Sequence, residues 1–166
     1  MTGKPPRLSW VEMTEIVLPQ HTNALGTMFG GTVVSWVDVA GAACALRHCN
    51  NAVVTASIDA MHFLQPICLG WIVTLRAAVN FTSRTSCEIG VRVEAENPLT
   101  GEKSHTASAY LTFVAVGKDG KPIEIPPVLP ETKEEKLRFA AAQERRKARL
   151  VLKETLAKRW QAGEKS

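Results

Sequence analysis

The sequence lacks the motifs of several large enzyme classes. It contains no G-x-S-x-G nucleophile elbow, which argues against a serine hydrolase triad. It also contains neither a Walker loop nor a G-x-G-x-x-G fingerprint, so nothing supports nucleotide-phosphate binding through those loops. The four cysteines form no C-x-x-C pair and lack the spacing of a zinc site. We therefore expect no metal site, and we interpret all four cysteines as reduced and structural, namely Cys44, Cys49, Cys68 and Cys87.

Long apolar runs are absent as well. No stretch is long enough to span a bilayer, and the N-terminus has no apolar run of the signal-peptide type. These absences favour a soluble, cytoplasmic protein without a membrane partner. The chain has 166 residues, of which 45% are hydrophobic, so it has the length of one domain with a substantial core.

Excess basic charge is confined to the C-terminal part of the chain. Residues 131–166 hold 11 Lys and Arg against 6 Asp and Glu, whereas residues 1–130 hold 9 against 10. We therefore divide the chain into a near-neutral domain over residues 1–130 and a basic helical extension over residues 131–166. A nucleic-acid partner would have to bind the extension alone, and we expect none. We interpret the extension as a helix that packs on an oligomer, with an arm that binds phosphate or nucleic acid as the alternative.

The central feature of the sequence is the uninterrupted segment from Gly30 to Arg47. It contains no proline, and its length fits a helix that ends near Asn50. The segment is apolar all round, which is typical of a buried helix, and its single carboxylate is Asp38. A buried carboxylate is costly unless it is paired or used chemically. Asp38 is therefore either part of a structural pair or a catalytic group.

The rest of the pattern predicts an antiparallel sheet. Three later segments alternate apolar and polar residues, as strands do when one face of a sheet is buried. With two less regular segments they predict five strands, and a sheet packed on one helix gives an α+β fold. The five expected strands cover residues 8–18, 53–64, 71–81, 87–95 and 104–116.

One group of residues carries a family resemblance. The pattern N-x-x-G-x-x-F-G-G, followed by an aspartate seven residues later, resembles the signature of acyl-CoA thioesterases with the hotdog fold, in the bacterial YciA and brain acyl-CoA hydrolase group. The resemblance extends over residues 8–126. The residues that carry it are His21-Thr22-Asn23, Gly26, Phe29-Gly30-Gly31, Asp38, Val53-Val54-Thr55, Phe63-Leu64-Gln65-Pro66 and Phe113-Val114-Ala115-Val116.

The resemblance implies both an architecture and an activity. The hotdog fold is an antiparallel five-stranded sheet wrapped around one central helix, here with a C-terminal helical tail. The family hydrolyses acyl-CoA to a free fatty acid and coenzyme A, without a metal or an organic cofactor. It also forms homo-oligomers, in which dimers with shared active sites commonly assemble into a hexamer as a trimer of dimers.

The resemblance also implies roles for the residues around the start of the helix. Unpaired N–H groups and the positive end of the helix dipole lie there, and Gly30 has no side chain to block approach. The Gly31 N–H would serve as an oxyanion hole for the thioester. Asp38 would act as a general base or as a nucleophile. Asn23 would position water or the carbonyl in a site completed by a second subunit, the alternative being a turn residue that bonds its own backbone.

Further polar residues are candidates for substrate binding. We expect His21 in the substrate loop. Thr55 and Ser57 alternate on one strand, where they would line the site or bond Asp38 unless they are ordinary strand hydroxyls. A polar turn and one later lysine would bind the phosphates of coenzyme A, with plain hairpin chemistry as the alternative. The residues of this last group are Ser83, Arg84, Thr85, Ser86 and Lys118.

Two rival functions stand beside hydrolysis. A non-catalytic acyl-CoA sensor would bind the thioester without turnover, but it would not need both Asn23 and Asp38. A hotdog hydratase or dehydratase would use a His with a carboxylate in a pattern such as H-F-P-x-x-P, which this sequence lacks. The sequence leaves open the acyl chain length, the choice between base and nucleophile for Asp38, and any nucleotide regulation.

Overall fold

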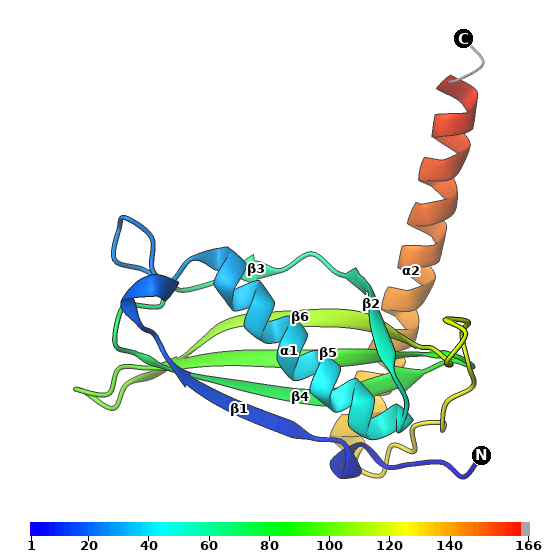
Figure 1. The fold of residues 1–166 in the computed structure, drawn as a ribbon, viewed down its shortest axis with the longest axis horizontal. Helices are drawn as coiled ribbons and strands as arrows, with labels where there is room; N and C mark the ends of the chain where they lie inside the picture. Colours follow the sequence, from blue (N-terminus) through cyan, green and yellow to red (C-terminus); the bar gives the residue numbers. More distant parts are fainter. Residues whose placement is uncertain (164–166) are drawn as a thin grey trace. The chain divides into compact units, whose positions relative to one another are not determined.

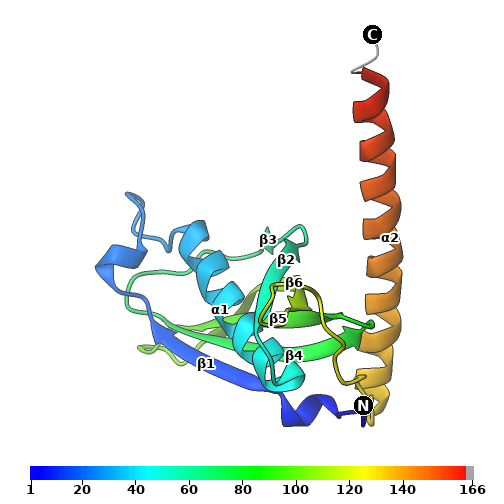
Figure 2. The same cartoon turned by 45° about the vertical axis from the view of Figure 1, so that its right-hand side comes forward.

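The segment predicted as the central helix forms α1 (Gly30–Cys49) in a computed structural model that describes residues 1–163. The helix contacts all the long strands of a single sheet, and Figures 1 and 2 show it crossing one face of that sheet. Gly41 allows this close approach, since a Cβ there would come within 3.1 Å of Phe113 Cε2. The helix ends where Asn50 adopts a left-handed φ of 51° and donates its N–H to the Leu46 carbonyl.

The sheet is antiparallel throughout, which confirms the α+β class. Its strand order is β1-β4-β5-β6-β2, and the short β3 also pairs with β6. The strands are β1 (Val11–Ile16), β2 (Val53–Ile58), β3 (His62–Phe63), β4 (Ile72–Thr82), β5 (Ser86–Glu96) and β6 (Lys103–Ala115).

The alternation of the three long strands builds the core. Every second side chain of β4, β5 and the second half of β6 is buried on the face that meets α1. Each large apolar side chain that becomes fully buried contributes roughly 1.5–3 kcal/mol. The largest of these side chains are Phe113, Leu75, Ile89 and Leu111.

The sheet has six strands rather than the five expected, because the segment predicted as one strand over residues 53–64 is divided into β2 and β3. Its pairing with β6 is also irregular at two places. Thr55 pairs with Phe113 and Ser57 with Thr112, which leaves Ala56 as one extra residue. Farther on, four steps of chain from Ile58 to His62 face three steps on β6. Such bulges bend edge strands and often lie beside active sites. The first strand is also shorter than predicted, since Pro6–Leu8 form a 3₁₀ turn.

The chain divides into two compact units, and the second begins at Pro130. It contains α2 (Lys133–Gly163), which lies within the segment 131–166 predicted as a helical extension. Glu135 Oε2 accepts the N–H groups of Glu131 and Thr132, while Thr132 Oγ1 accepts the Glu135 N–H, which is a capping box. Burial pulls the pKa of Glu135 upward, but these donors outweigh it and the pKa is lowered. Neither helix of the described residues is long and apolar enough to cross a membrane.

The cysteines are all free thiols. Cys44, Cys49 and Cys87 are buried where the end of α1 meets the start of β5. Burial raises the pKa of the Cys44 thiol to about 12. A hydrogen bond with Cys49, together with burial, also raises the pKa of Cys87. The same hydrogen bond lowers the pKa of Cys49, so Cys44 and Cys87 are the thiols that behave as inert small core residues.

A buried histidine joins three segments of the first unit. His48 lies at the end of α1 and is fully buried. Its Nδ1 is 3.2 Å from Ser9 Oγ, and its Nε2 is 3.0 Å from the Pro126 carbonyl oxygen, to which it donates. Nδ1 therefore accepts the Ser9 hydroxyl in the neutral ring. Burial lowers the pKa of His48, although the Pro126 carbonyl opposes that change.

This pKa shift predicts a pH-dependent loss of stability. Since the unfolded ring has a pKa near 6.5, the unfolded chain binds a proton before the folded chain does. The contribution of His48 is thus complete above about pH 6.5 and falls as the pH is lowered through that value. We expect His48→Gln to lower stability at pH 8 by roughly 1–3 kcal/mol and to flatten the decline between pH 7 and 5. Thermal unfolding of both proteins across this range is the measurement, and identical pH profiles would contradict the assignment.

Candidate active site

The carboxylate of Asp38 is held by a hydroxyl from the neighbouring strand. Thr55 Oγ1, on β2, donates to Asp38 Oδ1 over 2.8 Å. The carboxylate is half-buried, and in residues 1–163 no cation forms an ion pair with it. Thr55 can donate only one proton, so Oδ2 stays available for another partner. The carboxylate is oriented by Thr55 but is not neutralised by a basic side chain.

The first turn of α1 presents two N–H groups without partners. Phe29 is the N-cap residue and provides no side-chain hydrogen bond. Its carbonyl accepts the N–H groups of Thr32 and Val33, while those of Gly30 and Gly31 bind nothing within the described part of the chain. Gly31 and Asp38 are seven residues apart, so they lie on one face of α1 about two turns apart. The positive end of the helix dipole and a carboxylate therefore share this face.

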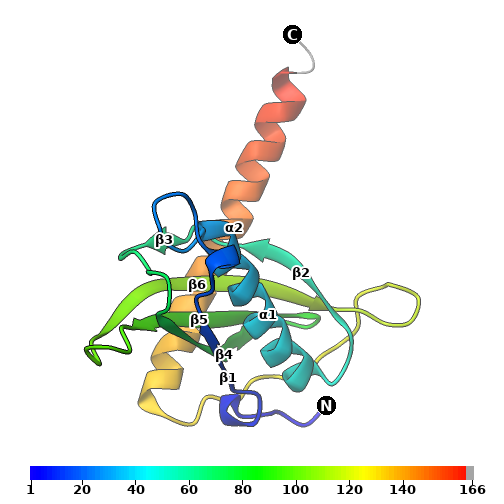
Figure 3. The ribbon, with the colours of Figure 1, turned by 60° about the vertical axis from the view of Figure 1, so that its left-hand side comes forward.

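Two aromatic rings stand beside these N–H groups. A Cβ on Gly31 would lie 2.7 Å from Phe29 Cε1, so a larger residue would displace the ring. On the other side, the tip of the Phe63 ring lies 3.4 Å from the position of a Gly30 Cβ. Figure 3 shows β3, which carries Phe63, at the same end of α1 as the preceding loop. Neither ring was predicted to have a role, although both belong to the segments that carried the resemblance.

Asn23 closes its own loop. Its Oδ1 accepts the N–H groups of Leu25 and Thr27 over 2.9 and 3.3 Å, and its Nδ2 lies 3.1 Å from Thr27 Oγ1. The turn role considered for Asn23 is therefore present in the single chain. No hydrogen bond joins Asn23 to Asp38 among the residues that the structure describes.

His21 fastens this loop to α1. Its Nδ1 accepts the Leu18 N–H over 3.1 Å, and its carbonyl accepts the Phe29 N–H over 2.8 Å. Leu18 and Phe29, which flank the loop, are therefore both hydrogen-bonded to His21. The ring meets Trp36 of α1 edge to face, with a centroid distance of 5.0 Å. Such aromatic pairs contribute about 0.5–1.5 kcal/mol beyond area burial, so His21 orders the loop that carries Asn23.

The other predicted substrate-binding residues lie apart from this cluster. Ser57 pairs with Thr112, whereas Thr55 pairs with the buried Phe113. The bulge at Ala56 thus places the two hydroxyls on opposite faces, and of the two only Thr55 bonds Asp38 among the described residues.

The predicted polar turn joins β4 to β5. Ser83 and Ser86 bond each other through their hydroxyls over 2.7 Å, and the Thr85 carbonyl accepts the Ala115 N–H. Arg84 is an exposed partner of Glu124 at 3.7 Å. Lys118 lies in the turn after β6 and is exposed. Over residues 1–163, no hydrogen bond or ion pair connects this turn or Lys118 with Asp38, Thr55 or Asn23.

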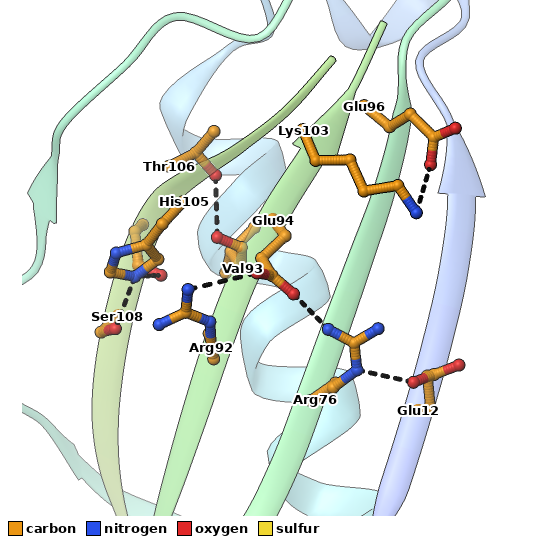
Figure 4. A network of polar contacts seen from close by, with 11 residues as sticks. Glu12, Arg76, Arg92, Val93, Glu94, Glu96, Lys103, His105, Thr106 and Ser108 are labelled. Atoms are coloured by element: carbon orange, nitrogen blue, oxygen red, sulfur yellow. Dashed lines mark hydrogen bonds and ion pairs between the residues drawn. The ribbon is translucent and has the colours of Figure 1, made fainter. Parts of the chain in front are cut away.

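A polar network covers part of the sheet face opposite α1 (Figure 4). Arg76 pairs with Glu12 on one side and with Glu94 on the other, and Arg92 binds the second oxygen of Glu94. Burial raises the pKa of Glu94, but Arg92 and Arg76 outweigh it and the pKa is lowered. Exposed pairs of this kind contribute at most about 1 kcal/mol each. Each charged side chain in this network has an oppositely charged partner. We therefore interpret the network as a surface feature and not as a reactive site.

Comparison with known proteins identifies the family. Residues 25–102 match the family model of the thioesterase superfamily. The uncharacterized acyl-CoA thioester hydrolase YkhA of Bacillus subtilis is 42% identical over 127 residues, which is 76% of this chain and 74% of YkhA. An apo-hexameric acyl-CoA thioesterase of known structure is 42% identical, with a TM-score of 0.88 over 91% of this chain and 97% of that one.

An acyl-CoA hydrolase from Staphylococcus aureus was solved with butyryl coenzyme A, coenzyme A and coenzyme A disulfide. It is 36% identical, with a TM-score of 0.85 over 93% of this chain and 96% of that one. Structures of three of its variants carry alanine in place of an asparagine, an aspartate 15 residues later and a threonine 17 residues after that. Asn23, Asp38 and Thr55 repeat these residue types and spacings. These matches confirm the hotdog fold, and the chain belongs to the thioesterase superfamily as an acyl-CoA thioester hydrolase.

Proposed function

We propose that this chain hydrolyses acyl-CoA to a free acid and coenzyme A at the N-terminal half of α1. One observation carries the proposal. Asp38 is oriented by Thr55 on the same helix face as the partner-free N–H of Gly31. A carboxylate and an anion-binding N–H at this spacing are the two elements that hydrolysis of a thioester needs.

The residues divide the reaction between them. The thioester oxygen accepts the Gly31 N–H, and the helix dipole stabilises the negative charge that develops on it. Asp38 Oδ2 takes a proton from water as the water oxygen attacks the carbonyl carbon. The carbon–sulfur bond then breaks and the proton passes to the sulfur of coenzyme A. In the nucleophilic variant, Asp38 itself attacks, and water hydrolyses the resulting anhydride.

Substrate contacts beyond the reacting atoms are also part of the proposal. His21 orders the loop, and Gly30 leaves the approach to the N–H groups open. Arg84, with the turn around it, and Lys118 supply positive charge and N–H groups for the phosphates of coenzyme A. Ser57 lies on the face of β2 opposite to Thr55. The cytoplasmic location expected from the sequence stays a prediction.

We further propose that the protein is a hexamer built from dimers, each dimer holding two shared sites. A solved relative of high similarity is hexameric. Within one chain the amide of Asn23 is used to close its own loop and has no bond to Asp38. The loop is exposed, so the loop of one protomer can lie over the helix of its partner.

Release of free thiol from acyl-CoA substrates of increasing chain length tests the activity. The purified protein is expected to release one thiol for each thioester consumed. Tight binding of acyl-CoA without thiol release would identify a sensor and would overturn the proposal.

Asp38→Asn should reduce turnover by roughly 10² or more, the scale of general-base catalysis. The amide keeps the size of the side chain and can still accept the Thr55 hydroxyl, but it cannot take a proton from water. Circular dichroism should show an unchanged fold. A folded variant with a kcat near that of the wild type would remove Asp38 from the mechanism.

Thr55→Val should lower kcat by roughly 10- to 100-fold, because a hydrogen bond to a charged group contributes about 1.5–3 kcal/mol. Valine has nearly the same shape and suits a strand. Thr55→Ser is the matched control, since it keeps the hydroxyl, and it should stay within a few-fold of the wild type. Equal activity of the valine and serine variants would show that the bond to Asp38 has no part in catalysis.

Mixing two inactive variants tests the shared site. Asn23→Ala and Asp38→Ala are each expected to be inactive, but a mixed dimer has one site with both lesions and one with neither. Random reassortment of equal amounts makes half of the dimers mixed, so about a quarter of the wild-type activity should return. Exchange must be verified with a tag after reversible dissociation. Verified mixed dimers that are as inactive as the parents would place Asn23 and Asp38 in the same chain's site.

A further inference from the structure

The aromatic rings that border the Gly30–Gly31 pair have no role in the reaction as described. Phe29 precedes the helix, and Phe63 comes from β3, more than thirty residues later in the chain. Their side chains are 59% and 52% exposed in the single chain. A pair of half-exposed phenylalanines is costly in water, and these two stand beside the N–H groups proposed to bind the thioester oxygen.

The geometry restricts how a thioester can reach those N–H groups. The Phe29 ring lies against Gly31, where a Cβ would be only 2.7 Å from Cε1, and the Phe63 ring tip lies 3.4 Å from the Cβ position of Gly30. The two glycines are therefore bordered by one ring each. An acyl group whose oxygen reaches the Gly31 N–H must place its first carbons next to aromatic carbon.

We infer that Phe29 and Phe63 are specificity residues that select acyl chains without a polar substituent on carbon 2 or carbon 3. This inference rests on the proposed function and adds the substrate class. Unsubstituted carbons 2 and 3 gain apolar contact with the rings. A hydroxyl on carbon 3 would lose water there, and neither ring offers it a hydrogen-bond partner.

The two phenylalanines are held by different parts of the fold. Phe29 is the N-cap residue, and its backbone N–H is fixed by the His21 carbonyl, so its ring is tied to the loop that carries Asn23. Phe63 is fixed by the pairing of β3 with β6, where it lies opposite the buried Ala107. Phe63 therefore lies outside the loop that carries Asn23, and its removal should alter selectivity without disturbing that loop.

The test compares hexanoyl-CoA with 3-hydroxyhexanoyl-CoA, which differ by one oxygen. The wild type should prefer hexanoyl-CoA by about 10-fold in kcat/KM, within the range by which an apolar pocket discriminates against an added hydroxyl. Phe63→Ala should reduce that preference at least threefold, mainly through a higher KM for hexanoyl-CoA. Phe63→Leu, which keeps an apolar side chain, should restore most of it. Leu64→Ala is the matched control, since Leu64 is the exposed neighbour of Phe63, and it should leave the preference unchanged.

The outcomes separate this inference from the proposed function. A wild-type protein that hydrolyses both thioesters with equal kcat/KM, or a Phe63→Ala variant that slows both equally, would overturn the selectivity while leaving the hydrolase intact. A folded wild-type protein that releases thiol from neither substrate, nor from any other acyl-CoA, would overturn the proposed function itself. A reduced preference in Phe63→Ala with unchanged preference in Leu64→Ala would support the inference.

Discussion

The packing of α1 on the sheet is the constraint on which the rest of the structure depends. The half-buried carboxylate of Asp38 lies on a helix of twenty residues. Its position therefore depends on how the sheet holds that helix. Gly41 brings the helix close to Phe113, and Phe113 is the cross-strand neighbour of Thr55. The contact that seats the helix therefore also sets the distance between Thr55 and Asp38, so core packing and site geometry are determined together.

Much of this arrangement could be predicted from the sequence because it follows local rules. The helix is recognisable from its length and its lack of proline, and three strands from their strict alternation. The spacing from Gly31 to Asp38 places both residues on one helix face whatever the tertiary structure is. The identity of the family required the motif as a whole, since no single residue of it carries chemistry that is specific to thioesters.

The remaining features depend on contacts that a linear pattern does not contain. The bulge at Ala56 arises from the pairing of an edge strand, and it separated Thr55 from Ser57 where simple alternation had joined them. The ring of Phe63 meets the helix start from β3, a segment distant in the sequence, so spacing could not place it there. His21 looked like a residue for the substrate, yet its Nδ1 and carbonyl are both used to hold the loop.

The two interruptions between β2 and β3 have a consequence for how this protein can change in length. Each inserts one residue relative to β6, and because two insertions restore the alternation of faces, both Thr55 and Phe63 point toward α1. Deletion of Ala56, or of one residue between Ile58 and His62, would remove an extra residue and leave the remaining pairs with β6 unchanged, whereas deletion of a paired residue would shift the register and turn the side chains beyond it to the other face. Gain or loss of a single residue among related hydrolases should therefore occur at these two places and not at the paired positions, a pattern that sequence alignments can reveal without any assay.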